Sequence, residues 1–102
     1  MTKADFFNKV DELRNQTISS KSGRSSYSNI IRKNNLCSGI RSGSSKTPFE
    51  FNLDDIYRAY TNRTTLNTTS LKDFLGNNRC RSAALAIMMA SKLLDEYGNT
   101  LK

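Results

Sequence analysis

Residues 83–90 read Ala-Ala-Leu-Ala-Ile-Met-Met-Ala and form the longest apolar run in the chain. A helical pattern extends around this run over about 79–97, and Gly98 follows as a natural helix end. Because the helix is apolar on nearly all sides through its middle, it must be buried. The run is far shorter than the roughly 20 apolar residues that a membrane helix needs. The sequence therefore predicts a fold organised around a buried C-terminal helix.

Four other segments are predicted to be helical, over about 3–15, 27–33, 53–62 and 70–75. Thr2 can begin a capping box before the first of them, and Asn52 is a natural N-cap for the third. In the second segment, Tyr27, Ile30 and Ile31 recur at the i, i+3, i+4 spacing of a helix.

The remaining segments are predicted to be a hairpin and a loop. Residues 36–41 and 47–51 are short runs of strand-like alternation around a turn of Ser and Gly, which indicates a minor β-hairpin. Residues 16–29 are rich in Ser and basic residues and favour a flexible loop or arm. We therefore expect residues 1–102 to form a small single domain that is mostly α with this minor hairpin. An α+β fold is the alternative.

The net charge of +7 is concentrated in one stretch of the sequence. Between Leu13 and Phe49 there are seven Lys or Arg residues and no Asp or Glu, whereas the rest of the chain has nine of each kind. The same stretch is rich in Ser and Gly, whose hydroxyl and backbone N–H groups are ligands for phosphate oxygens. This pattern favours a surface for a polyanion. A solvated loop whose charge only aids solubility is the alternative.

The leading hypothesis is a small basic protein that binds nucleic acid in a regulatory or accessory role. DNA is preferred to RNA because the chain has no short RNA-binding signature, such as an aromatic-rich strand. Tyr27 could stack on a base. The residues expected at the interface are Arg24, Tyr27, Arg32, Lys33, Arg41, Lys46, Arg79 and Arg81. The alternative is an interaction or inhibitor protein that docks an acidic protein partner through the same basic face. The sequence leaves the oligomeric state open.

The charges of the basic stretch are expected to serve binding more than folding. Arg24, Arg32, Lys33 and Arg41 have no acidic neighbour in the sequence, so no local ion pair is lost when they are replaced. Surface substitutions of this kind usually change stability by no more than about 0.5 kcal/mol.

Catalysis is not expected, and neither is a metal, a cofactor or a membrane partner. The chain has no His, which excludes a Ser-His-Asp triad and any zinc site that contains His. Cys37 and Cys80 alone cannot make a structural zinc site, and both are expected to be buried free thiols. Because the N-terminal residues contain no apolar run of signal-peptide length, we expect the protein to be cytoplasmic.

Overall fold

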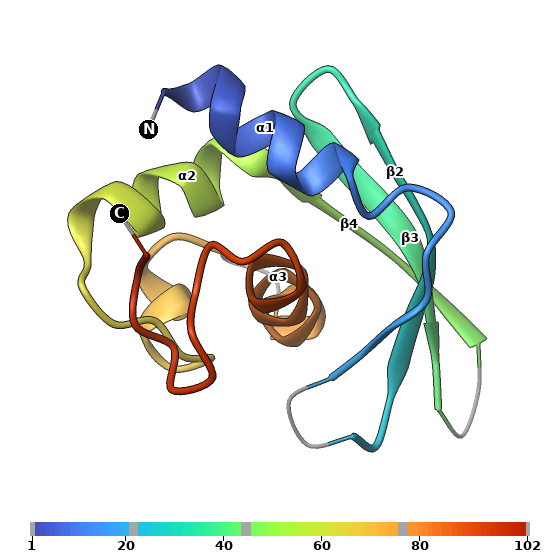
Figure 1. Ribbon diagram of the computed structural model, residues 1–102. Coiled ribbons are helices and arrows are strands. Elements are labelled where there is room, and N and C mark those ends of the chain that lie inside the picture. The colour runs from blue at the N-terminus through green and yellow to red at the C-terminus, as the bar shows by residue number, and fades with distance from the viewer. Residues whose placement is uncertain (1, 21–22, 44–45, 76–77, 102) are drawn as a thin grey trace.

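The protein has an α+β fold, in which helices cover one face of an antiparallel β-sheet (Figure 1). The structure is a computed structural model that describes residues 2–20, 23–43, 46–75 and 78–101, without the side chains of 78 and 79. The described elements are α1 (Lys3–Asp11), β1 (Ile18–Ser19), β2 (Ser26–Lys33), β3 (Leu36–Ser42), β4 (Lys46–Asn52), α2 (Leu53–Asn62), the 3-10 helix η1 (Ser70–Asp73) and α3 (Asn78–Ala90). The prediction of a mostly helical protein is therefore wrong.

The expected minor hairpin is part of a larger sheet. The hairpin itself is confirmed as β3 and β4, which pair along their whole length. The strands follow one another in the order β1-β2-β3-β4, and each is antiparallel to the next. Residues 16–29, predicted as a loop or arm, contain β1 and the beginning of β2, with residues 21 and 22 outside the described part.

The helix predicted over 27–33 is wrong, because these residues form β2. A β-bulge explains the misleading pattern. Ser28 pairs with Ile40 and Ile31 pairs with Ser38, so two residues of β2 lie opposite the single Gly39. Asn29 lies in the bulge and has a φ of 54°, a conformation that Asn tolerates better than most residues. As a result, Tyr27 and Ile30 are three residues apart and both buried, as they would be on one face of a helix.

Close packing across β3 explains the glycine opposite the bulge. A Cβ atom on Gly39 would lie 2.7 Å from the ring of Phe49 and 2.8 Å from the carbonyl oxygen of Ser28. A side chain at this position would therefore push the sheet apart. Gly39 allows Phe49 to contact Tyr27 edge to face, with ring centroids 5.7 Å apart.

The core lies between the sheet and the helices. Residues 83–88 of α3 are buried, and residues 89 and 90 are half-buried, so the predicted burial of this run is confirmed. Helix α3 packs against β1, β4 and η1, while α1 packs against α2 and β2. Phe6 of α1 contacts Tyr60 of α2, with ring centroids 5.2 Å apart, and both belong to the same core.

The last helix is shorter than the predicted 79–97. It ends at Ala90, and Lys92 has a φ of 63°. Beyond it, the carboxylate of Asp95 accepts hydrogen bonds from the backbone N–H groups of Tyr97 and Asn99, each at 2.9 Å. These bonds hold a turn in place of a further helical turn. The hydrogen bond from the backbone N–H of Asn99 is the main cause of a lowered pKa of Asp95.

The helix starts that depended on capping residues are confirmed. Thr2 and Asp5 exchange the two hydrogen bonds of a capping box at the start of α1. The side chain of Asn52 accepts a hydrogen bond from the backbone N–H of Asp54 at 2.8 Å, and α2 covers the predicted 53–62. By contrast, α1 ends at Asp11 rather than at residue 15. Within the described residues, no helix is long and apolar enough to span a membrane.

Candidate nucleic-acid interface

One end of the sheet gathers three of the predicted interface residues. The register aligns Ser26, Ser42 and Lys46 in one row across β2, β3 and β4. Arg41 precedes this row on β3, and Arg24 lies two residues before β2. The side chains of Arg24, Arg41 and Lys46 are exposed. We call this end of the sheet, defined by Arg24, Arg41 and Lys46, the basic end; it is the lower end in Figure 1.

A serine hydroxyl orients one of these cations. The Oγ atom of Ser25 accepts hydrogen bonds from Nη2 of Arg41 at 3.2 Å and from Nε at 3.4 Å. Ser25 is itself held by Ser20, because the N–H of Ser20 donates to the carbonyl oxygen of Ser25 at 2.9 Å. A guanidinium has five N–H donors, so Arg41 keeps donors for an anion from solution.

The strands of the sheet and helix α3 carry a single acidic residue in their described parts. No Asp or Glu occurs between residues 13 and 49, which include the first three strands. Helix α3, which packs against β1 and β4, contains none in residues 78–90. On β4, Glu50 lies four residues beyond Lys46, which is about 13 Å along the strand. Within the described residues of β1 to β4 and α3, the one carboxylate is therefore about 13 Å from Lys46 along β4.

Two other predicted residues lie at the opposite end of β2. The length of β2 separates Ser26 from Lys33 by about 23 Å. The guanidinium of Arg32 donates to the carboxylate of Asp11 from Nε at 2.7 Å and from Nη2 at 2.8 Å. The expectation that Arg32 has no acidic partner is therefore wrong, because α1 brings Asp11 to it. These hydrogen bonds raise the pKa of Arg32. Lys33 is exposed.

The structure describes the side chains of two of the last three predicted residues. Tyr27 has no exposed surface, so it is part of the core and cannot stack on a base in this structure. Arg81 donates from Nε to the carbonyl oxygen of Leu75 at 3.1 Å, and this ties its side chain to the chain before α3. The side chain of Arg79 lies outside the described residues.

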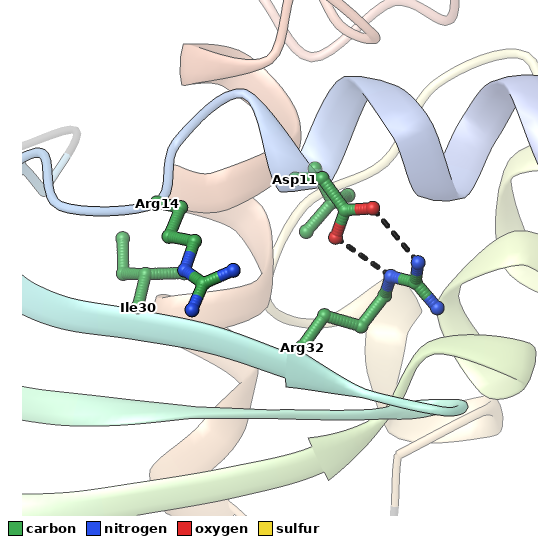
Figure 2. Close-up of a pocket in the computed structure, with 5 residues that line it drawn as sticks. Asp11, Arg14, Ile30 and Arg32 are labelled. Atoms are coloured by element: carbon green, nitrogen blue, oxygen red, sulfur yellow. Dashed lines mark hydrogen bonds and ion pairs between the residues drawn. The ribbon is translucent and has the colours of Figure 1, made fainter.

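A pocket between α1 and β2 was not predicted. It has a volume of about 300 Å³ and is lined by Val10, Asp11, Arg14, Ile30 and Arg32 (Figure 2). Arg14 belongs to the acid-free stretch, but no local pattern in the sequence indicates that it lies beside β2. The contact between the end of α1 and β2 makes Arg14 and Arg32 line the same pocket, with the guanidinium of Arg32 turned to Asp11 (Figure 2).

The outer face of the sheet, away from the helices, carries exposed apolar side chains. Ile31 is 50% exposed and Leu36 is 41% exposed. A shallow groove of about 560 Å³ follows this face, and Ile31, Ile40 and Pro48 line part of it. The charged residues Lys33 and Lys46 lie on the flanking strands.

The two thiols are buried, as predicted. Burial raises the pKa of Cys37 to about 12. The Sγ atom of Cys80 donates to the carbonyl oxygen of Glu50 at 2.9 Å and so provides a partner for the edge strand β4. Among the described residues, no three Cys, Asp or Glu residues form a group that could hold a metal ion.

Comparison of the chain with protein-family models, curated proteins and solved structures found no match. Its function is therefore inferred from its residues and their geometry alone.

Proposed function

We propose that the protein binds nucleic acid without catalysis, and duplex DNA in preference to RNA, through the basic end. The observation that carries this proposal is that Arg24, Arg41 and Lys46 lie at one end of the sheet, within a stretch of sequence that has no Asp or Glu. Lys and Arg side chains that replace the counterions of a phosphate backbone supply most of the affinity of non-specific nucleic-acid binding. The role would be regulatory or accessory.

The preference for duplex DNA rests on the sequence, which has no short RNA-binding signature such as an aromatic-rich strand. Arg41 and Lys46 lie on the neighbouring strands β3 and β4 of the four-stranded sheet. Their exposed side chains would contact phosphates, and this contact carries no sequence information by itself.

The test is binding of the intact protein to fluorescent duplex DNA, single-stranded DNA and duplex RNA of equal length over a series of salt concentrations. We expect the tightest binding to duplex DNA. With three phosphate contacts, the logarithm of the binding constant should fall against the logarithm of salt concentration with a slope of about −2.7. A binding constant that does not depend on salt, or no binding at low salt, would overturn the proposal.

An acidic protein partner is the second candidate, and the exposed Ile31 and Leu36 favour it. Apolar side chains on an uncovered sheet face are typical of protein interfaces and contribute nothing to phosphate contacts. The double substitution Ile31→Thr and Leu36→Thr makes this face of the sheet polar with a residue type that favours strands, and it separates the two candidates. If the protein binds DNA, the double variant should bind DNA as the wild type does. If it binds an acidic protein, the wild type should bind polyglutamate better than DNA at equal ionic strength, and the double variant should lose this preference.

A further inference from the structure

The outer face of the sheet carries an apolar strip along its third strand. Figure 1 shows the helices on the other face of the sheet. Successive side chains of a strand point to opposite faces, so Leu36 and Ile40 lie on the outer face of β3, whereas Cys37 is buried on the inner face. Ile31 of β2 and Pro48 of β4 extend the strip to both sides along the shallow groove. Contiguous apolar side chains on an exposed face mark a surface for another protein.

Charged residues of opposite sign flank this strip. The side chain of Arg32 reaches Asp11 on α1, so its neighbour Lys33 points to the outer face. Glu50 lines the groove on β4. Both Lys33 and Glu50 are exposed, and neither forms an ion pair with another described residue. The face is therefore complementary in charge to a copy of itself that is turned around β3.

We propose that a second copy of the chain binds this face. The two sheets pack face to face around a two-fold axis that runs along β3. Each β3 then faces the β3 of the other copy, and each β2 faces β4. An interface of this symmetry uses the same residues on both copies, and sheets packed in this way are about 10 Å apart.

The register of the strands gives the residues that meet. One row across β2, β3 and β4 is Lys33, Leu36 and Asn52, and the next row is Ile31, Ser38 and Glu50. The axis brings Leu36 of one copy onto Leu36 of the other. It also brings Ile31 onto the methylene groups of Glu50, with Lys33 one row away, about 7 Å along the strand. The long side chain of Lys33 spans this offset, so each copy forms an ion pair with Glu50 of the other.

The alternative direction of the axis fits less well. With the axis along β3, Lys46 faces Ser26 of the second copy, so no two like charges among the described residues of this face lie opposite each other. An axis across the strands would place β4 against β4. It would pair Glu50 with Lys46 only by moving Leu36 past the end of β3 in the second copy. Apolar contact and charge pairing therefore agree on the axis along β3.

The dimer is a property of concentrated protein. Three strands of a small sheet make a modest interface, so we expect a dissociation constant of roughly micromolar order. Binding and unfolding measured on more dilute protein therefore concern the monomer. None of the proposed contacts involves Arg24 or Arg41, so the inference does not depend on the proposed function.

The first test is sedimentation equilibrium of the intact protein over a series of concentrations, in which we expect a monomer–dimer equilibrium. Glu50→Lys puts like charges together at both symmetry-related points, so it should raise the dissociation constant roughly tenfold or more. As the matched control, Glu96→Lys makes the same change of charge on the segment after α3 and should dimerise as the wild type does. A wild type that stays monomeric at millimolar concentration, or an unchanged constant in Glu50→Lys, would overturn the proposal.

The second test shows whether the ion pair forms between copies. Lys33→Glu should also weaken the dimer, because it places two glutamates together. In an equimolar mixture of Lys33→Glu and Glu50→Lys, one copy presents two glutamates at these positions and the other presents two lysines. Opposite charges then meet at both points, so the mixture should form a heterodimer about as tightly as the wild type forms its dimer. A mixture that stays monomeric where the wild type is dimeric contradicts the pairing.

Two controls keep the outcomes separate. The three single variants replace exposed side chains, so each should unfold at the wild-type urea concentration. The variant Arg24→Gln, Arg41→Gln should lose affinity for DNA and still dimerise, so failure of the basic end and failure of this interface are distinguishable. If the wild type is a monomer that binds polyglutamate through Ile31 and Leu36, the face belongs to an acidic protein and the proposal is wrong.

Discussion

Arg32 and Asp11 are 21 residues apart in the sequence, and their bidentate ion pair joins β2 to the end of α1. Paired hydrogen bonds between charged groups are stronger than single neutral ones, but both side chains are partly exposed to water. We therefore expect Arg32→Gln to lower the free energy of unfolding by about 1 kcal/mol. Urea unfolding of this variant should be compared with that of Lys33→Gln, which neutralises the exposed neighbour. Equal stability of the two variants would contradict a structural role for the pair.

The burial of α3 predicts a large difference between two isoleucines. Ile87 has no exposed surface, whereas Ile31 is 50% exposed on the outer face of the sheet. Ile87→Ala should lower the free energy of unfolding by roughly 2–5 kcal/mol, because it leaves a cavity in the core. Ile31→Ala removes the same atoms and should cost less than about 1 kcal/mol. If the two losses are similar, α3 is not the buried centre of the fold.

The carboxylate of Asp54 gives the fold a pH dependence. It pairs with Lys3, which is the main cause of its lowered pKa, and accepts a hydrogen bond from Nδ2 of Asn35 at 2.8 Å. Because its folded pKa lies below the ordinary value of 3.8, this stabilisation is complete above that value and is lost as the pH falls through the folded pKa. Asp54→Asn should make the free energy of unfolding depend less steeply on pH between about pH 5 and pH 2. A profile as steep as that of the wild type would show that the pair stabilises nothing.

The two thiols should be protected in the folded protein. Cys37 has no exposed surface, and burial raises its pKa to about 12, so its reactive thiolate form is rare at neutral pH. Cys80 is 2% exposed. A thiol reagent such as Ellman's reagent should label both only as fast as the protein unfolds, and both at once in denaturant. Rapid labelling of Cys37 in the native state would contradict its place in the core.

Elements whose signals are local could be predicted from the sequence. The start of α2 depends on Asn52, which caps the helix as expected. The strand β2 could not be predicted, because the bulge at Asn29 moves the apolar residues from a spacing of two to a spacing of three. The end of α3 was missed because Asp95 forms a turn while Leu93 and Leu94 continue the apolar pattern of the helix.

The candidate site was predictable in its charge but not in its arrangement. The acid-free stretch is visible in the sequence, and it contains Arg24, Arg41 and Lys46. Their position at one end of the sheet depends on the register of β2, β3 and β4. Arg32 forms an ion pair with Asp11, a residue outside the stretch, and is therefore not available as an unpaired cation. Neither relationship has a local signal. The exposed position expected for Tyr27, which lies between Arg24 and Arg32 in the sequence, is wrong, because its ring contacts Phe49 in the core.

The most direct test of DNA binding by the basic end compares two variants that each lose three positive charges. One carries Arg24→Gln, Arg41→Gln and Lys46→Gln. The other, as a matched control, carries Lys9→Gln, Lys72→Gln and Lys92→Gln, which lie on α1, η1 and the segment after α3. The measurement is the slope of log binding constant against log salt concentration on duplex DNA.

We expect the basic-end variant to lose affinity for all DNA sequences and to flatten the slope by about 2.7, which is roughly 0.9 for each lost contact. The control variant should keep the wild-type slope, and both should unfold at the same urea concentration as the wild type. Equal slopes for the two variants would show that DNA binding depends on net charge alone and would contradict an interface at the basic end.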